Sequence, residues 1–171
     1  FTYSLLTRSL RITHSNLRER DPAFADRVDA AFAAQAGAPA AVPPMFTPFK
    51  LRELVIPNRI VVSPMCMYSA TDGTVDDWHV VHLGSRAVGG AGLVIAEMTD
   101  VQAIGRISPG CAGLYKDEHI TPWARVVDFV HRHSEAKIGV QLAHAGRKGA
   151  SHRLWEGRGQ PLPPEERWPL L

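Results

Sequence analysis

Residues 92–99 read Gly-Leu-Val-Ile-Ala-Glu-Met-Thr and are apolar at almost every position. Two other short apolar runs occur in the chain, Arg-Ile-Val-Val-Ser-Pro-Met at 59–65 and Lys-Ile-Gly-Val-Gln-Leu-Ala-His at 137–144. Strands that are apolar on both faces are typical of a parallel sheet covered by helices. The sequence therefore predicts three buried strands, at 59–65, 92–99 and 137–144.

Helical patterns separate these three strands. Residues 78–91 are predicted to form one helix that ends at Gly89-Gly90, and residues 117–136 a second helix that is interrupted near its start by Pro122. One side of the second helix can be lined by Trp123, Val126, Phe129 and Val130. The order strand, helix, strand, helix, strand predicts an α/β fold, either a barrel or a doubly wound sheet.

The N-terminal part of the chain has a different character. Residues 1–37 read as helix, with Asp21 as N-cap, Pro22 in the first helical position and Gly37 just past the end. Residues 38–44 are rich in proline and alanine and read as a linker. The C-terminal tail is irregular and rich in proline, and no internal repeat is visible.

The composition limits the classes of function. Of 171 residues, 45% are hydrophobic and 21% are charged, which allows a core and a polar surface. The net charge of +2 gives no electrostatic reason to expect nucleic acid or an anionic membrane as partner. No apolar run reaches the roughly 18 residues that span a bilayer, and the first residues lack the pattern of a signal peptide. The two cysteines, Cys66 and Cys111, form neither a disulfide framework nor a zinc spacing, so we expect a cytoplasmic location.

Polar or polarizable side chains follow each predicted strand. Functional sites of parallel α/β folds lie at the carboxyl ends of the strands. The candidates there are Ser63, Pro64, Met65, Cys66 and Tyr68 for the first strand, Glu97, Met98 and Thr99 for the second, and Gln141, His144 and Arg147 for the third. Each has an ordinary structural alternative, since proline ends strands and methionine fills cores. Gln141 is harder to explain in this way, because a buried amide needs partners and can pair with an imide edge.

Other kinds of site are disfavoured. His79 and His82 lie three residues apart in a predicted helix, but no Asp, Glu or Cys completes a metal-ligand set at the usual spacing. The glycine-rich stretch 89–93 precedes a strand, whereas a dinucleotide-binding fingerprint follows one. No Gly-x-Ser-x-Gly motif occurs. The sequence thus gives no reason to expect a metal site, a Rossmann site or a serine hydrolase.

Five segments occur in a fixed order: NRIVVSPMCMYSA (58–70), WHVVHLGSRAVGGAGLVIAEMT (78–99), GRISPG (105–110), DEHI (117–120) and KIGVQLAHAGRKG (137–149). Together they resemble the Old Yellow Enzyme family of flavin-dependent NADH:flavin oxidoreductases and ene-reductases. The resemblance runs from about Met45 to Gly149. It implies the N-terminal portion of a (β/α)8 TIM barrel, about three strand–helix units of a fold that usually takes about 250 residues, preceded here by a helical segment.

The resemblance also implies a cofactor and roles for particular residues. The family binds FMN without a covalent bond and uses NADH or NADPH as reductant. Cys66 would lie near the reactive end of the flavin, Gln141 would hydrogen-bond its pyrimidine edge, and Tyr68 would contact substrate. The flavin would be lined by Ser63, Pro64, Met65, Cys66 and Met98, of which Met98 departs from the small residue that is frequent at its position. Such a wall suits a flavin because it is apolar and polarizable and supplies a few directed hydrogen bonds and a group that shifts the electronics of the ring.

No catalytic residue is assigned. The family's proton donor, its substrate-anchoring histidine pair and its phosphate-binding loops would lie downstream of residue 171. We therefore expect the 171-residue chain to be inactive by itself.

The first 44 residues resemble a junction found in bifunctional proteins. These proteins fuse an FAD-dependent aromatic-ring monooxygenase to an Old Yellow Enzyme-like domain, and are of the salicylyl-CoA 5-hydroxylase and 2-aminobenzoyl-CoA monooxygenase/reductase type. The resemblance implies that residues 1–37 end an upstream FAD domain, that 38–44 form a linker and that 45–171 begin an FMN-binding barrel. The implied substrate is a small molecule, either an activated alkene or an aromatic acyl-CoA. Assembly into a homo-oligomer is compatible with this resemblance.

Three hypotheses stay open at this stage. The chain is the FMN-binding part of a reductase fused to a hydroxylase, a piece of a stand-alone Old Yellow Enzyme, or a truncated remnant that binds no flavin and has no activity. The motifs at all three strand ends favour the first hypothesis for the parent protein, whereas the missing downstream residues favour the third for this chain taken literally.

Overall fold

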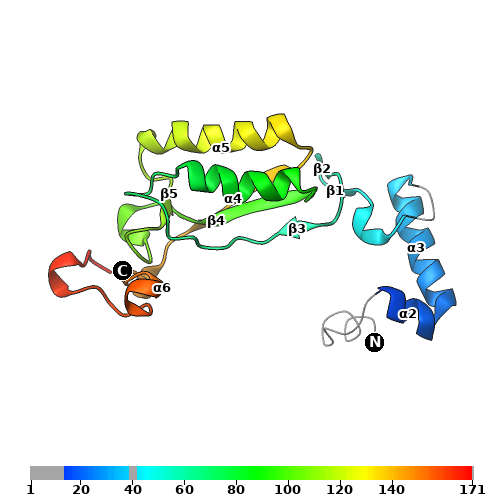
Figure 1. Cartoon of the computed structure of the whole chain (residues 1–171), viewed down its shortest axis with the longest axis horizontal. Coiled ribbons are helices and arrows are strands. Elements are labelled where there is room, and N and C mark those ends of the chain that lie inside the picture. Colours follow the sequence, from blue (N-terminus) through cyan, green and yellow to red (C-terminus); the bar gives the residue numbers. More distant parts are fainter. Residues whose placement is uncertain (1–13, 39–41, 171) are drawn as a thin grey trace. The chain divides into compact units, whose positions relative to one another are not determined.

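The computed structural model describes residues 14–38 and 42–170, which fall into two compact units, one up to Arg59 and one from Ile60 onward (Figure 1). The first unit contains α2 (His14–Arg20), α3 (Pro22–Ala36), the 3-10 helix η1 (Pro44–Phe46) and an antiparallel hairpin of β1 (Phe49–Leu51) and β2 (Leu54–Ile56). The hairpin was not predicted from the sequence. Residues 1–13 of the predicted N-terminal helix and 39–41 of the predicted linker lie outside the described residues.

Helix α3 has the predicted ends. The Asp21 side chain accepts a hydrogen bond of 2.9 Å from the Phe24 N–H, which satisfies one of the free donors in the first turn. Gly37 adopts the left-handed conformation with φ of 62° and donates to the carbonyls of Ala33 and Ala34. The N-terminal helix is thus confirmed for residues 22–36, with Asp21 and Gly37 as its caps.

Arg59 joins α3 to the hairpin within the first unit. Its guanidinium lies 4.6 Å from the ring centre of Phe32 and 5.0 Å from that of Phe49. The same group donates to Thr47 Oγ1 at 3.0 Å and to the Pro48 carbonyl at 3.2 Å. One cation therefore stacks on an aromatic ring from each element and fixes the turn between them.

The second unit is a parallel sheet centred on β4 (Leu93–Asp100). Strand β6 (Lys137–Ala143) pairs with β4 along one edge, and the other edge is shared by β3 (Val61–Val62) and β5 (Ala112–Gly113). The predicted strand 59–65 is therefore wrong in length, because only Val61 and Val62 join the ladder. The short β5, which was not predicted, takes the edge of β4 at Thr99 and Asp100.

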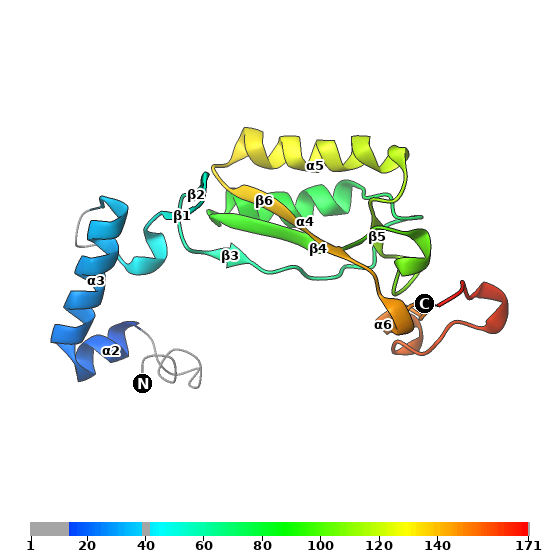
Figure 2. The same ribbon diagram turned by 180° about the vertical axis from the view of Figure 1, so that it is seen from behind.

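Two helices cover one face of this sheet, as Figures 1 and 2 show. They are α4 (Asp77–Val88) and α5 (Ile120–His133), and the 3-10 turn η3 (Asp117–His119) precedes α5. Pro122 lies in the first turn of α5, where its missing N–H is not needed, so it starts the helix rather than interrupting it. The core between sheet and helices consists of Ala70, Val75, Leu83, Ala87, Val94, Ala96, Ala112, Trp123, Val126, Val130 and Ala136.

The remaining turns follow the strands. η2 (Ala103–Gly105) comes after β4, and η4 (Gly146–Lys148), α6 (Leu154–Gly157) and η5 (Pro164–Glu166) come after β6. The sequence β3–α4–β4–α5–β6, with all strands parallel, is the pattern of successive strand–helix units in a (β/α)8 barrel. The predicted fold class is confirmed.

Gly84 allows close contact between α4 and α5. A Cβ atom at this position would lie 2.5 Å from Cε1 of Phe129, which is too close for any real contact. We predict that Gly84→Ala lowers the free energy of unfolding by about 1–3 kcal/mol, because α5 must move or the Phe129 ring must leave its rotamer. The measurement is urea denaturation followed by circular dichroism.

Gly139→Ala is the matched control for this prediction. A Cβ at Gly139 in β6 meets no atom within 4 Å. Equal losses of stability in the two variants would show that the close contact between α4 and α5 is not what requires a glycine at position 84.

Candidate functional site

The segment 63–70 continues from β3 as irregular chain, and Tyr68 within it has a positive φ of 53°. The Met67 N–H donates to Glu97 Oε2 at 3.0 Å, and the Ala70 N–H donates to the Gly110 carbonyl at 3.0 Å. The Ser69 hydroxyl closes a local turn onto the Met67 carbonyl at 3.1 Å. These bonds fix the segment without a ladder partner.

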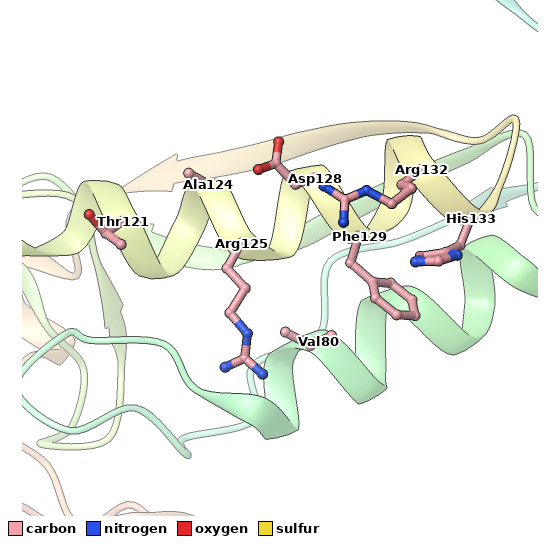
Figure 3. Close-up of a pocket in the computed structure, with 8 residues that line it drawn as sticks. All are labelled: Val80, Thr121, Ala124, Arg125, Asp128, Phe129, Arg132 and His133. Carbon is pink, nitrogen blue, oxygen red and sulfur yellow. The ribbon is translucent and has the colours of Figure 1, made fainter.

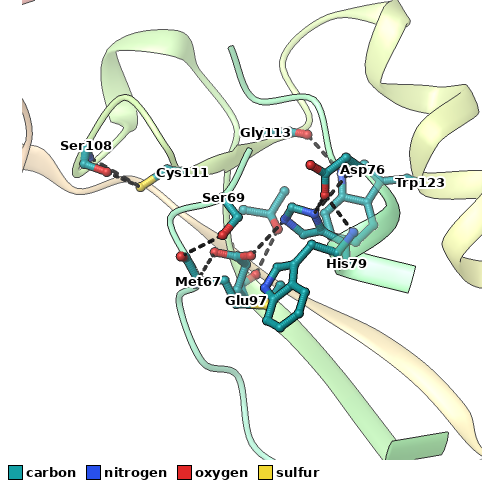
Figure 4. A network of polar contacts seen from close by, with 11 residues as sticks. Met67, Ser69, Asp76, His79, Glu97, Ser108, Cys111, Gly113 and Trp123 are labelled. Carbon is teal, nitrogen blue, oxygen red and sulfur yellow. Dashed lines mark hydrogen bonds and ion pairs between the residues drawn. The ribbon is translucent and has the colours of Figure 1, made fainter. Parts of the chain in front are cut away.

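A buried histidine and a buried glutamate hold this segment in place (Figure 4). His79 of α4 is fully buried, with Nε2 3.2 Å from Glu97 Oε1 and Nδ1 3.0 Å from Asp76 Oδ1. Burial by itself would lower the pKa of His79, but the carboxylates of Glu97 and Asp76 outweigh it and the pKa is raised. His79 Nδ1 also accepts a hydrogen bond of 3.1 Å from the Asp76 N–H, which closes the capping box of α4. The ring therefore lies between two acids, and Glu97 Oε2 accepts the Met67 N–H while Oε1 faces His79.

The predicted flavin-facing residues from the three strand ends come together. Against the larger effect of burial, the Met98 backbone and the Tyr68 phenol are close enough to Cys66 to lower the pKa of its thiol. Met98 is directly in register with Gln141 on the neighbouring strand. The structure therefore brings together Cys66, Tyr68, Met98 and Gln141.

The other predicted residues lie along the same strand ends with fewer contacts. Ser63 and Met65 are exposed and Pro64 is half-buried, in the extended chain that leads to Cys66. His144 accepts a hydrogen bond from the Gly146 N–H at 3.1 Å and packs its ring against Gly105. Arg147 is exposed in η4.

The thiol of Cys66 is held in its protonated form. Burial is the main reason that its pKa is raised, and the nearby carboxylates of Glu97 and Asp100 raise it further. The pKa of the Tyr68 phenol is also raised, first by burial and then by the two cysteines nearby. At neutral pH both groups can therefore donate hydrogen bonds.

Two features of the site were missed in the sequence. The Trp155 ring meets the Tyr68 ring edge-on, with centroids 6.1 Å apart at 70°, although 65% of Trp155 is exposed. Asp100 is fully buried at the end of β4, and neither of its carboxylate oxygens has a hydrogen-bond partner among the described residues. A tryptophan in a polar tail and an aspartate directly after an apolar strand were the signals available.

A groove lies elsewhere in the second unit, between α4 and α5 (Figure 3). It is lined by Val80, Thr121, Ala124, Arg125, Asp128, Phe129, Arg132 and His133. These residues lie on the helices and include none of the strand-end residues. The chemistry of Cys66 and Gln141 therefore belongs to the carboxyl ends of the strands.

The residues at the strand ends fit an isoalloxazine ring. Met65 is 44% exposed and Met98 is half-buried, which leaves polarizable thioethers open to a flat apolar ligand. The exposed Gln141 amide has no hydrogen-bond partner among the described residues, so its donor and acceptor are available to the polar edge of such a ring. Within residues 14–38 and 42–170, His, Cys, Asp and Glu side chains form no group that could hold a metal ion.

The fold and these residues define a segment of a parallel α/β barrel with a wall suited to a flavin. The sequence profile of the NADH:flavin oxidoreductase / NADH oxidase family matches residues 44–160. The chain belongs to this family, as the five motifs predicted.

Relatives and solved structures agree with this assignment. An NADPH dehydrogenase of Listeria monocytogenes serotype 4a (strain HCC23) is 53% identical over 106 residues, which are 61% of this chain and 31% of that protein. Morphinone reductase in complex with tetrahydroNAD superposes with a TM-score of 0.59 at 31% identity, over 64% of this chain and 29% of that one. A 2-naphthoyl-CoA reductase in complex with 2-naphthoyl-CoA gives a TM-score of 0.58 at 25% identity, over 61% of this chain and 16% of that one. The chain thus spans 31% of the length of the first curated relative.

No helix among the described residues is long and apolar enough to cross a membrane.

Loss of the buried imidazole should destabilise the second unit. We predict that His79→Gln lowers the free energy of unfolding by about 3 kcal/mol, because the buried Glu97 carboxyl loses its histidine partner. The matched control is His82→Gln in the same helix, whose half-buried ring has no ion pair among the described residues. Urea denaturation of both variants checks the prediction, and similar losses would contradict it.

The buried Asp100 should make stability depend on pH. Burial raises the pKa of Asp100 from 3.8 to about 7, against a lowering effect of Arg106 and a smaller raising effect of Glu97. The native chain then keeps a proton that the unfolded chain releases near pH 4, so stability falls as the pH rises from about 4 to about 7. We predict that the stability of Asp100→Asn minus that of the unsubstituted protein is more positive at pH 8 than at pH 5. Thermal melts at the two pH values test this, and a pH-independent difference would contradict it.

Proposed function

We propose that this chain forms the flavin-facing, N-terminal part of an FMN-dependent NAD(P)H oxidoreductase of the ene-reductase type. The observation that carries the proposal is the convergence of Cys66, Met98 and Gln141 at the carboxyl ends of three neighbouring parallel strand segments. When bound, FMN supplies hydride transfer from NADH or NADPH to an electron-poor substrate. The family assignment supports this reading of the site.

Each predicted residue has a distinct task in this proposal. Ser63, Pro64, Met65 and Met98 line the flavin and exclude water from it. Gln141 pairs its amide with the pyrimidine edge, which has donors and acceptors of complementary kind. Cys66 stays a neutral thiol and donates a hydrogen bond toward the reactive end of the ring, where added charge would disfavour reduction. The proton donor is expected downstream of this chain.

Tyr68 is proposed to contact the substrate, with Trp155 as a second wall. The two rings form an edge-on pair, and Trp155 is largely exposed and free to cover a planar group. This arrangement favours a small conjugated molecule, either an activated alkene or an aromatic acyl-CoA. The likeness to 2-naphthoyl-CoA reductase supports the second of these classes.

We also propose that the parent protein is bifunctional. Residues 1–37 would end an upstream FAD-dependent aromatic monooxygenase, 38–44 would link it to the barrel, and 45–171 would begin the FMN domain. The support is the resemblance of the junction sequence and the presence of helix α3 before the barrel. Cys66 and Cys111 are both free thiols, which supports a reducing, cytoplasmic location.

Counting the released flavins tests these proposals. The protein made from the complete reading frame is denatured, and FMN and FAD are quantified per chain. One of each is expected for a fusion of two flavin domains. FMN alone would keep the barrel function and overturn the fused hydroxylase, and no flavin after reconstitution would overturn both in favour of an inactive remnant.

Gln141 provides a residue-level test. We predict that Gln141→Leu weakens FMN binding about tenfold, because a polar edge of the ring loses its paired donor and acceptor. Titration of the apoprotein with FMN, followed by quenching of flavin fluorescence, gives the dissociation constant. Gln160→Leu, an exposed amide in the tail, is the control and should leave it unchanged.

A further inference from the structure

Two large apolar side chains, Leu154 and Trp155, lie exposed in the short helix α6, at 60% and 65%. They belong to residues 151–161, which follow β6 and η4 and which we call the α6 loop (Figure 2). Trp155 meets the ring of Tyr68, the residue proposed to contact substrate. Neighbouring exposed apolar groups beside a site indicate a surface that contacts a ligand.

The base of the α6 loop is closed by backbone contacts. Ser151 forms an antiparallel bridge with Pro161, and the His152 N–H donates to the Gln160 carbonyl at 2.8 Å. The Ser151 N–H donates to the Ile107 carbonyl at 2.8 Å, which ties the loop to the chain that follows β4. The exposed tip therefore stands on a base with defined backbone bonds.

Arg153 docks the α6 loop on the chain that carries Tyr68. Its guanidinium and the Tyr68 carbonyl both approach the Cα atom of Gly110 closely. A Cβ atom at Gly110 would lie 2.2 Å from the Tyr68 oxygen and 2.6 Å from Arg153 Nε, which no real contact allows. Gly110 is itself joined to the Tyr68 segment, because its carbonyl accepts the Ala70 N–H at 3.0 Å. A glycine is thus required where the loop and the segment meet.

The remaining contacts of Arg153 add little to stability. Its Nη1 pairs with Glu156 Oε1 at 2.9 Å within the same loop, and the two side chains are 30% and 42% exposed, so the pair contributes little. Its Nε is buried and finds no hydrogen-bond partner in the described ranges, which costs free energy. A shorter apolar side chain would avoid this cost. The place of Arg153 is therefore best explained by what it holds, the neighbouring Trp155.

We propose that the α6 loop is the specificity element of the substrate site, in which Trp155 recognises a planar aromatic group and Arg153 and Gly110 are positioning residues that hold Trp155 against Tyr68. The edge-on contact leaves most of the Trp155 ring open, so a flat conjugated ring can stack on it. Arg153 and Gly110 touch neither flavin nor substrate in this account. The inference rests on the proposed function, in which Tyr68 faces the substrate, and adds the residues that select among substrates.

Two thioesters that differ in one group test the proposal. Both trans-cinnamoyl-CoA and trans-crotonyl-CoA are conjugated alkenes, and the first carries a phenyl ring where the second carries a methyl group. Each is titrated by calorimetry into the complete protein with oxidised FMN and without NADH or NADPH, so that binding is measured without turnover. We expect the unsubstituted protein to bind cinnamoyl-CoA more tightly, and Trp155→Leu to reduce this preference about three- to tenfold.

The positioning residues should act on the same preference without meeting the ligand. We expect Arg153→Leu and Gly110→Ala to reduce the ratio of the two dissociation constants about threefold or more, because Trp155 loses its support beside Tyr68. A merely structural role would weaken both thioesters alike and leave the ratio unchanged. If Gly110→Ala does not fold, Trp155→Leu and Arg153→Leu decide.

Arg158→Gln is the matched control, because it removes an exposed arginine from the same loop. Loss of this charge affects both CoA esters equally, so the ratio should stay as in the unsubstituted protein. An unchanged ratio in Trp155→Leu or in Arg153→Leu, or an equal reduction in Arg158→Gln, would overturn the proposal.

The FMN content of the same samples separates this inference from the proposed function. A protein that binds FMN and has no preference for the phenyl-bearing thioester refutes the role of the α6 loop alone. A protein that binds no FMN after reconstitution refutes the proposed function, and the inference falls with it.

Discussion

The ion pair between His79 and Glu97 is the interaction on which the site depends. It joins α4 to the central strand β4 and leaves one carboxylate oxygen free to accept the Met67 N–H. The chain after β3 has no ladder partner at that point, so this bond replaces the missing strand pairing. The positions of Cys66 and Tyr68 follow from it, because they lie on either side of Met67 in the same segment. Buried pairs of titratable groups are rarely a source of stability, but here the contact gives the site a defined geometry.

Much of this architecture could be predicted from the sequence, because the apolar strands and the caps are local signals. The run 92–99 corresponds closely to β4. Asp21 and Gly37 are the caps of α3, as predicted. The length of the strand at 59–65 was overestimated, because that length depends on which neighbouring strand pairs with the edge of β4. That neighbour, β5, has only two residues, Ala112 and Gly113, and no sequence pattern marks it.

The composition of the site was predictable in part, and its electrostatics were not. Cys66, Met98 and Gln141 were found because they follow apolar runs, and parallel strands end at a common edge. Asp100 escaped notice because an aspartate after a strand usually begins a turn. Its burial without a partner depends on the loop that covers it and on the engagement of Arg106 by Asp72. Such competition among distant residues cannot be inferred from spacing along the chain.

The register shift in β4 has a consequence for tolerance to mutation. Ala96 pairs with Val140 and Met98 with Gln141, so Glu97 is an extra residue inserted into the ladder. Because of this residue, Ala96 and Glu97 can both face the helices before the alternation resumes at Met98. A single-residue deletion in β4 ahead of Glu97 would reverse the later side chains and carry Met98 and Asp100 to the helix side, whereas deletion of Glu97 itself would keep their faces but remove the partner of His79. The same deletion in the proline-rich tail would change little. Libraries of insertions and deletions should therefore find β4 among the least permissive segments of the chain, although its individual side chains are ordinary.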